Sequence, residues 1–203
     1  SGGVKTIYTT NSAFAALKYD GSVVTWGRSS NGGDSSGVDF SGGVSTIYSN
    51  AYAFAALKND GSVVTWGRSN VGQDEFDEDL SGSGGDSSGV DLSSGVSTIY
   101  STNEAFAALK NDGSVVTWGA SWAGGDSSGV DLSGGIGAIY STDFAFAAIL
   151  DDADGDGVKD NIDVFPDNPT ESADTDSDNI GDNSDEFPTI STQDILSAIR
   201  SNP

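Results

Sequence analysis

The chain of 203 residues contains no cysteine and no histidine. Disulfide bonds are therefore excluded, and the thiol and imidazole groups that often serve as nucleophiles, general bases and transition-metal ligands are absent. Basic residues are also scarce, because eight Lys and Arg oppose 31 Asp and Glu, which gives a formal net charge of −23 at pH 7. Such a charge repels phosphate groups, so nucleic acid and anionic membrane surfaces are disfavoured as partners.

Long apolar segments are missing as well. Hydrophobic residues make up 35% of the chain, and no apolar run approaches the roughly 18 residues that cross a bilayer. We therefore expect no membrane insertion. Glycine is abundant, with 28 residues, which predicts many turns. No acidic residue is set apart from the others as a catalytic group would be. The composition thus indicates an acidic, turn-rich protein that is not an enzyme and has no catalytic residues.

Internal repeats organise the first three quarters of the chain. The segment YAFAALKNDGSVVTWG at 52–67 has close copies at 12–27 and 104–119, and a fourth copy begins at 144–152 and then diverges. The copies lie 40, 52 and 40 residues apart, and one acidic insertion at 73–84 accounts for the longer spacing. Two further motifs separate them: GGDSSGVD and a segment close to GGVSTIYS. The chain is therefore a repeat array.

Each repeat is predicted to form short strands. VSTIYS is rich in β-branched and aromatic residues, and AFAALK and SVVTWG flank an Asp-Gly turn that is typical of a hairpin. GVDL is predicted as a short fourth strand. Strands that are apolar on both faces belong to sheets that are covered on both sides. A unit of about 40 residues with three or four strands suits a propeller blade, with a β-solenoid as the alternative.

The repeated core resembles the regulator-of-chromosome-condensation repeat, whose blades carry an ALxxDGxVxxWG core. The resemblance covers about 4–150 and is carried by Leu17–Gly27, Leu57–Gly67 and Leu109–Gly119. The His that this family often has before the AL segment is replaced here by alanine, at Ala13, Ala53 and Ala105. The resemblance implies a blade-like fold, but it does not carry over the family's nucleotide-exchange activity.

Three full repeats and a fragment are fewer than the roughly four to eight blades of a closed propeller. An open array leaves apolar faces and strand edges uncovered at both ends. A second chain, further repeats or head-to-tail stacking into a fibre would cover them. The incomplete fourth copy favours stacking, because strands of a neighbour could complete it. We therefore expect self-association into an oligomer or filament.

The composition changes after Leu150, and residues 151–203 carry 15 acidic and two basic residues. The acids occupy positions 1, 3, 5, 9 and 12 of two loops, which is the spacing of oxygen ligands in a calcium loop. Position 7 supplies a backbone carbonyl, and position 6 needs a residue that tolerates a sharp turn: Gly157 in the first loop and Asn179 in the second. The predicted ligands are Asp152, Asp154, Asp156, Val158, Asp160 and Asp163, and Asp174, Asp176, Asp178, Ile180, Asp182 and Asp185.

Each loop is followed by Phe-Pro, at 165–166 and 187–188. The pattern DxDxDGxxDxxDxFPxxP resembles thrombospondin type 3 repeats over about 151–188. That resemblance implies a chain that wraps around Ca²⁺ with little regular secondary structure. The alternative for an acidic run is a solvated, disordered tail. The prediction is thus all-β: an array of propeller-like blades over 1–150, an irregular calcium-wrapped segment over 151–188, and a short helix or tail over 189–203.

Several other residues have a predicted role. Trp26, Trp66 and Trp118 recur at one blade position, which favours packing within or between blades. Trp122 lies outside the repeat, where it could stack on a sugar, anchor an interface or pack locally. The aspartates of the GGDSSG motifs, Asp34, Asp86 and Asp126, are predicted to form Asx turns. A solvated loop is predicted for the acids of the insertion, which are Asp74, Glu75, Asp77, Glu78 and Asp79. Near the C-terminus, Thr192 is predicted to cap a short helix whose apolar stripe is Ile195, Leu196 and Ile199.

The sequence favours a secreted or cell-surface protein that is calcium-stabilised, structural or adhesive, and self-associating, as on a bacterial surface or in an extracellular matrix. Extracellular calcium is millimolar, so weak loops built only from Asp can stay loaded there. Two alternatives remain open. One is a glycan-binding, lectin-like propeller, and the other is a fragment of a larger bacterial surface adhesin.

Overall fold

The computed structural model describes residues 2–69, 82–191, 193–194 and 196–197. The chain forms two compact units, Ser1–Ile149 and Leu150–Pro203, here called the repeat unit and the acidic unit. The predicted solvated loop of the insertion acids lies outside the described residues, as do the predicted N-cap Thr192 and the apolar positions Ile195 and Ile199.

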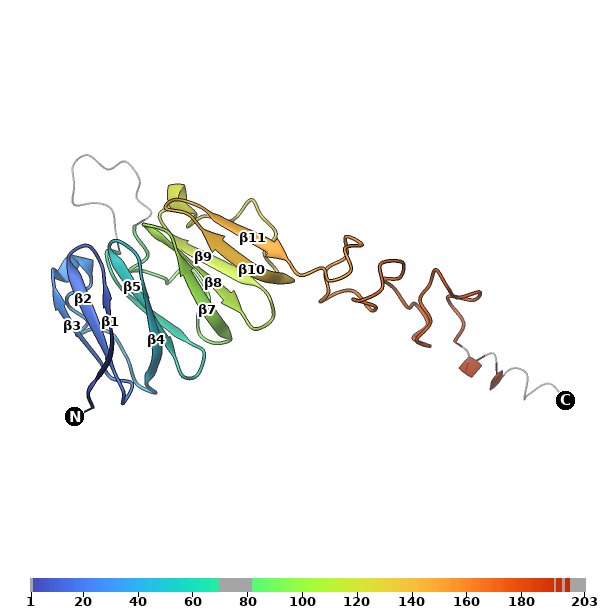
Figure 1. The fold of residues 1–203 in the computed structure, drawn as a ribbon, viewed down its shortest axis with the longest axis horizontal. Coiled ribbons are helices and arrows are strands. Elements are labelled where there is room, and N and C mark those ends of the chain that lie inside the picture. The colour runs from blue at the N-terminus through green and yellow to red at the C-terminus, as the bar shows by residue number, and fades with distance from the viewer. Residues whose placement is uncertain (1, 70–81, 192, 195, 198–203) are drawn as a thin grey trace. The chain divides into compact units, whose positions relative to one another are not determined.

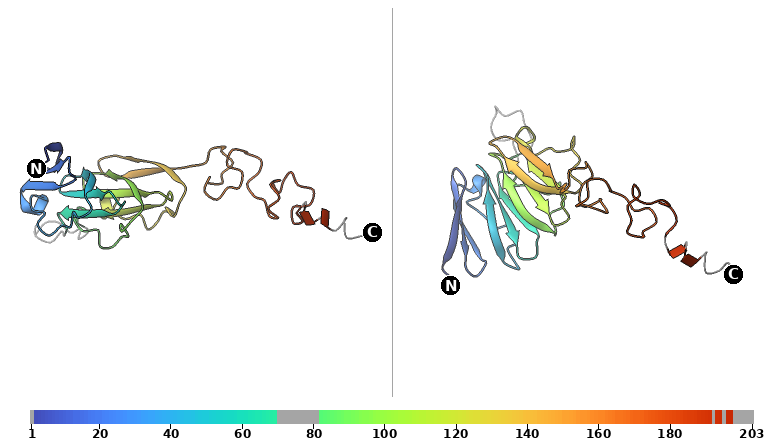
Figure 2. Two further views of the ribbon diagram at one scale, coloured as in Figure 1. Left: turned by 90° about the horizontal axis from the view of Figure 1, so that it is seen from below. Right: turned by 45° about the vertical axis from the view of Figure 1, so that its right-hand side comes forward.

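Antiparallel sheets make up the repeat unit, with strands in sequence order within each sheet (Figures 1 and 2). Sheet A contains β1 (Val4–Thr9), β2 (Ala13–Lys18) and β3 (Val23–Gly27); sheet B contains β4 (Val44–Ser49), β5 (Ala53–Lys58) and β6 (Val63–Gly67). Sheet C contains β7 (Val96–Ser101), β8 (Ala105–Lys110) and β9 (Val115–Gly119); sheet D has only β10 (Ile136–Ser141) and β11 (Phe146–Leu150). Two 3₁₀ turns, η1 (Ser29–Asn31) and η2 (Ser121–Ala123), follow β3 and β9. This all-β arrangement of small antiparallel meanders confirms the predicted blade-like fold and differs from a β-solenoid.

The predicted hairpins are confirmed. In sheet B, β5 and β6 pair so that Phe54 lies opposite Trp66, and the turn between them is closed by Asp60. Its Oδ1 accepts hydrogen bonds from the amide and the hydroxyl of Ser62, at 3.0 and 2.6 Å. The same turn recurs in sheets A and C. In sheet A the hydroxyl and amide of Ser22 lower the pKa of Asp20 to about 2.

The prediction of a fourth strand from GVDL is wrong. The linker between sheets B and C passes through consecutive Asx turns, in which Asp86 accepts from the Ser88 amide and Asp91 from the Ser93 amide. It meets the edge of sheet B through the bond from the Val63 amide to the carbonyl of Leu92, at 2.9 Å. The linker lies beside β6, where the Thr65 hydroxyl donates to the carbonyl of Gly85 and to the hydroxyl of Ser87, at 3.2 and 3.0 Å, but it turns too often to pair with β6 as a strand. The predicted Asx turns are confirmed at Asp34, Asp86 and Asp126.

The sheets pack face to face through two different surfaces. The front face of sheet B carries Phe54, Ala56 and Trp66, and its back face carries Ala53, Ala55 and Leu57; the other sheets have faces at the equivalent positions. The front face of sheet B packs on the back face of sheet A, and the back face of sheet B packs on the front face of sheet C. The alanines allow close approach because they add little bulk. Strands covered on both sides were predicted, and sheets B and C confirm this.

The repeated tryptophans stabilise these contacts by ring stacking and hydrogen bonds. Trp66 stacks on Phe54, with 5.1 Å between ring centroids, and its Nε1 donates a hydrogen bond to the carbonyl of Gly32 in the preceding linker, at 3.0 Å. Trp118 makes the same bond to Gly84, at 3.1 Å. The predicted packing role is therefore confirmed for Trp66 and Trp118. Trp26 also packs within its own blade, where it stacks on Phe14 with 5.2 Å between ring centroids. It is nevertheless 43% exposed, because none of the described residues forms a sheet over the front face of sheet A.

Apart from Leu150 at the end of β11 and helical residues at 193–194 and 196–197, the described residues of the acidic unit form turns and irregular chain. Its shape comes mainly from hydrogen bonds between carboxylates and nearby backbone amides rather than from a ladder of strands. None of the helical residues in the described ranges belongs to a segment with the length and apolar character needed to cross a bilayer.

Candidate metal centre

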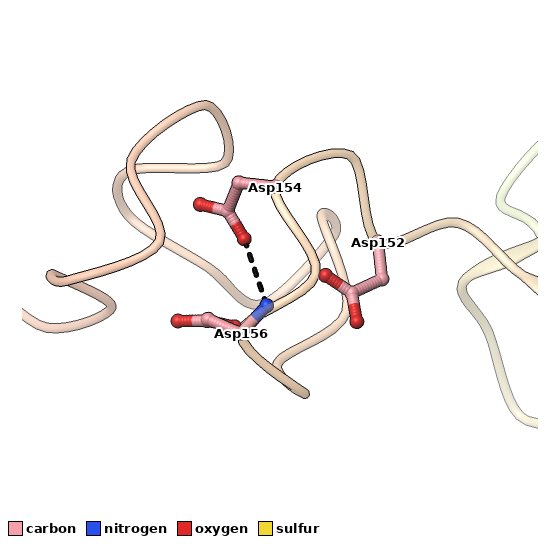
Figure 3. A group of neighbouring side chains, drawn as sticks. All are labelled: Asp152, Asp154 and Asp156. Carbon is pink, nitrogen blue, oxygen red and sulfur yellow. Dashed lines mark hydrogen bonds between the residues drawn. The ribbon is translucent and has the colours of Figure 1, made fainter.

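The first acidic loop gathers three carboxylates. Asp152, Asp154 and Asp156 each offer an oxygen, and these atoms lie within 4.8 Å of one another (Figure 3). Asp152 accepts hydrogen bonds from the amides of Gly155 and Gly157, at 2.9 and 3.2 Å, and Asp154 accepts one from the Asp156 amide, at 3.1 Å. Both glycines have positive φ, which lets the chain turn tightly enough to bring the side chains together.

The second loop repeats this geometry. Asp174, Asp176 and Asp178 also bring oxygens within 4.8 Å of one another. Asp174 accepts from the amides of Asp178 and Asn179, at 3.1 and 2.9 Å. Ser177 and Asn179 have φ of 60° and 70°, at the positions of the two loop glycines. The prediction that Asn179 replaces glycine at the sharp turn is confirmed, whereas the positive φ of Ser177 was not anticipated.

Buried oxygens in both loops lack a hydrogen-bond donor among the described residues. They belong to positions 3 and 12: Asp154 Oδ2 and Asp163 Oδ2 in the first loop, and both oxygens of Asp176 and Oδ2 of Asp185 in the second. Asp163 is only 8% exposed. A buried charged oxygen without a partner is strongly unfavourable. A cation bound by these oxygens would remove that cost, and a set of carboxylates suits a hard cation such as Ca²⁺.

The electrostatics of the loops agree with this geometry. Burial raises the pKa of Asp154, and the charges of nearby carboxylates, Asp163 among them, raise it further. Burial raises the pKa of Asp176 as well, and Asp185 is among the charges that add to the effect. The aspartate at position 12 therefore acts on the aspartate at position 3 in each loop, although the two are nine residues apart in sequence.

The aspartates at position 9 have a different role from the other predicted ligands. Asp160 accepts a hydrogen bond from the amide of Ala153, at 2.7 Å. Asp182 accepts bonds from both the amide and the hydroxyl of Thr175, at 2.8 and 2.6 Å, and these bonds lower its pKa. Neither residue belongs to the clusters of three carboxylates. In each loop the aspartate at position 9 therefore accepts a hydrogen bond from the backbone amide at position 2, which holds the two parts of the loop together.

The residues at position 7 are Val158 in the first loop and Ile180 in the second. The amide of Val158 donates to Asp156 and the amide of Ile180 donates to Asp178, at 2.7 and 3.0 Å. These bonds orient the aspartate at position 5. The role of the two carbonyl groups as ligands stays a prediction.

Glu171 is a buried carboxylate that the sequence analysis missed. It is 3% exposed, its Oε2 accepts the amide of Asn183 at 3.0 Å, and its Oε1 has no hydrogen-bond partner among the described residues. Gly181 leaves room for it, because a Cβ there would overlap the carboxylate. Glu171 precedes the second loop by three residues, so a search limited to twelve loop positions passes over it. The available signal was a lone glutamate between two all-aspartate loops.

Trp122 lies in η2 of the repeat unit. Its side chain is 51% exposed and contacts Phe144, with 5.5 Å between ring centroids. The neighbouring Ala123 is fully buried and anchors this turn. Trp122 and Phe144 thus form an exposed aromatic pair beside sheet D.

Comparison with known proteins found no matching family model and no similar curated protein. Solved structures do match. The CRINKLY WD40 ectodomain of the Arabidopsis thaliana receptor kinase ACR4 is 13% identical, with a TM-score of 0.44, over 72% of this chain and 45% of that one. The ectodomain of the Physcomitrella patens receptor kinase CR4 is 14% identical, with a TM-score of 0.46, over 73% and 36%.

Yeast RCC1 (Prp20), solved with Kap60 bound, is 17% identical with a TM-score of 0.42, and the match covers 57% of this chain and 29% of that one. The chain thus spans less than half the length of each of these three structures. The matches include RCC1 and a WD40 ectodomain, and the resemblance of the acidic unit to thrombospondin type 3 repeats stays a prediction.

Proposed function

We propose that this chain is a non-enzymatic, calcium-stabilised structural or adhesive protein of the extracellular space, whose β-propeller-like repeat unit associates with further copies. One observation carries the calcium part of the proposal. Buried carboxylate oxygens without donors recur at positions 3 and 12 of both acidic loops. This repetition is the pattern expected for two cation sites of one design, and it is not expected of a solvated tail.

Calcium would have a structural role in each loop. The three clustered aspartates and the aspartate of position 12 would supply its oxygen ligands, and Glu171 would add a carboxylate beside the second loop. The bound cation offsets the mutual repulsion that otherwise opposes packing these charges together. Ca²⁺ suits such a site better than Mg²⁺, because Mg²⁺ dehydrates reluctantly and seldom accepts a cage made only of protein groups.

The proposed location is secreted or on a cell surface. Extracellular calcium modules bind with dissociation constants of about 10⁻⁴–10⁻³ M, a range that loops with Asp at position 12 can satisfy where calcium is millimolar. The acidic composition and the absence of cysteine agree with a protein that folds outside the cell without disulfides. A bacterial surface or an extracellular matrix is such a setting, where the chain would act alone or as part of a larger adhesin.

Catalysis is not part of this proposal. Among the described residues, the carboxylates whose pKa is raised are Asp154 and Asp176, and both belong to the clusters that would hold a cation. The composition provides no cysteine or histidine that could serve as nucleophile or base.

A calorimetric calcium titration tests the proposal. We expect the wild-type chain to bind Ca²⁺, and Asp154→Asn with Asp156→Asn to abolish binding by the first loop only. Asp176→Asn with Asp178→Asn should do the same for the second loop. The exposed Asp167, which lies between the loops, provides the control substitution Asp167→Asn. No heat of binding at millimolar Ca²⁺, or equal binding by all variants, would contradict the proposal.

A glycan-binding function is the second candidate, favoured by the exposed pair of Trp122 and Phe144. Aromatic faces of this kind stack on sugar rings. Quenching of tryptophan emission by oligosaccharides, lost in Trp122→Ala, would support it. Unchanged emission across a panel of sugars would exclude Trp122 as a sugar platform.

A further inference from the structure

Sheets A and D expose the two halves of a contact that the repeat unit makes repeatedly. On the front face of sheet A, Phe14 is 42% exposed, whereas its equivalents Phe54 and Phe106 are fully buried. Val4 and Ile7 of β1 are exposed on the same sheet. Their equivalents in sheet C, Val96 and Ile99, are buried against the back face of sheet B. The front face of sheet A therefore has the composition of a covered surface, but none of the described residues covers it as a sheet.

The back face of sheet D is the matching half. Ala145, Ala147 and Ile149 are exposed there. The equivalent residues of sheet B are Ala53, Ala55 and Leu57, which lie buried against sheet C. Inside this chain, the back face of one sheet packs on the front face of the next. The exposed back face of sheet D and the exposed front face of sheet A carry equivalent residues, so the two faces are complementary.

Backbone hydrogen bonds between sheets give the contact a defined register. The amide of Asn11 donates to the carbonyl of Ala51, the amide of Ala51 to Asn103, and the amide of Asn103 to Asp143, at 2.9, 3.0 and 2.8 Å. This ladder crosses all four sheets at the turn after the first strand of each. The series ends in the carbonyl of Asn11, which is an acceptor, and the amide of Asp143, which is a donor. The two ends can therefore form the same hydrogen bond with each other between two copies.

A row of tyrosines marks the same register. The hydroxyl of Tyr8 lies 3.2 Å from that of Thr46 in the next sheet, and Tyr48 lies 3.2 Å from Thr98. Tyr140 of sheet D is equivalent to these tyrosines and is 62% exposed. Thr6 of sheet A is equivalent to Thr46 and Thr98, the partners of the other two tyrosines, and it is also exposed.

We infer that the front face of sheet A binds the back face of sheet D of a second copy of this chain, in the register of the internal contacts. The inference rests on the self-association part of the proposed function and specifies its surface. In this register Tyr140 of one copy faces Thr6 of the next, and the amide of Asp143 meets the carbonyl of Asn11. Because the two faces differ, the contact is heterologous and joins copies head to tail, either into a closed pair or into a filament.

Disulfide trapping tests this register directly, because the wild-type chain has no cysteine. Thr6→Cys and Tyr140→Cys are made in separate chains, mixed in millimolar Ca²⁺ and oxidised. Docking brings the two thiols within reach of each other. Val130→Cys is the control partner for Thr6→Cys, because Val130 is 64% exposed and lies in the linker before sheet D, away from both faces. We expect about tenfold more heterodimer with Tyr140→Cys than with Val130→Cys, because docking gives the thiols a high effective concentration.

Phe14→Glu provides a second measurement. Phe14 is partly exposed in the single chain, so the variant should still fold, with the β-sheet circular dichroism spectrum of the wild type, while light scattering shows a monomer. Equal trapping by Tyr140→Cys and Val130→Cys, homodimers of Thr6→Cys alone, or a wild-type monomer at every concentration would overturn the inference. The trapping is repeated in chains that also carry Asp176→Asn and Asp178→Asn, while the calorimetric titration measures calcium binding by itself. A failure of the docking inference can then be distinguished from a failure of calcium binding.

Discussion

Glu171 shows how much a single residue can reveal about the acidic unit. It is almost fully buried, and one of its carboxylate oxygens accepts a backbone amide while the other has no donor among the described residues. Burying a carboxylate in this way is costly unless an opposite charge compensates it. Its contact with Asn183 places it against the second loop, so it belongs with the proposed ligands even though the twelve-residue spacing does not include it.

Replacing Glu171 by Gln should weaken calcium binding. The amide keeps the size and the hydrogen-bond acceptor of the side chain but removes its charge, so we expect about a tenfold loss of affinity, as for other residues that support a metal site. Glu186→Gln is the matched control, because Glu186 follows the second loop and is exposed. Calorimetry on both variants decides the matter. Equal affinities would mean that Glu171 has no part in the site.

At the scale of elements, the contact between sheets depends on a glycine in the linker. Gly32 has a φ of 93°, and a Cβ there would lie 2.5 Å from the ring of Phe54. The same residue accepts the hydrogen bond of Trp66 through its carbonyl. The linker therefore closes over the front face of sheet B only if it carries no side chain at this point.

Gly32→Ala should destabilise the repeat unit by about 2–4 kcal/mol, which combines the cost of a left-handed backbone and of overpacking against Phe54. Gly37 lies in the same linker, and a Cβ there meets no atom within 4 Å. Gly37→Ala should therefore change stability by no more than about 0.5 kcal/mol. Chemical denaturation of both variants measures the difference. Similar unfolding midpoints would show that the linker adapts and that Gly32 is not required.

At the scale of the whole molecule, the two units are stabilised by different interactions. The repeat unit has apolar clusters between its sheets. The acidic unit has repeated hydrogen bonds from backbone amides to carboxylates, and its clustered charges oppose compaction when no cation is bound. Chelation of calcium should therefore affect one unit and spare the other.

In EDTA we expect protease cleavage to become fast within 151–190 while the repeat unit keeps its melting midpoint. Mass spectrometry of the fragments locates the cuts, and circular dichroism follows the β-structure during heating. Added Ca²⁺ should restore protection, and added Mg²⁺ should not. A repeat unit that unfolds on chelation, or an acidic unit that resists protease in EDTA, would contradict this division.

The sequence by itself determined the local structure. The Asp-Gly turns, the Asx turns at Asp34, Asp86 and Asp126 and the tight loop at Asn179 follow from interactions between residues that are close in the chain. Such interactions are the same in every copy of a repeat, so a single pattern predicts them all. Repetition also predicted that sheets are covered on both sides, because their strands are apolar on both faces.

Only the tertiary structure decided which copies are covered and which carboxylates are buried. Trp26 and Trp66 have nearly identical neighbours in sequence, yet one is 43% exposed and the other 4%, because burial depends on whether another sheet lies against that face. GVDL has strand-like composition but makes turns, since the linker must return to the next sheet. Glu171 is buried by Gly181 and Asn183, ten and twelve residues away. Contacts of this kind depend on how the chain folds back on itself, which local spacing does not specify.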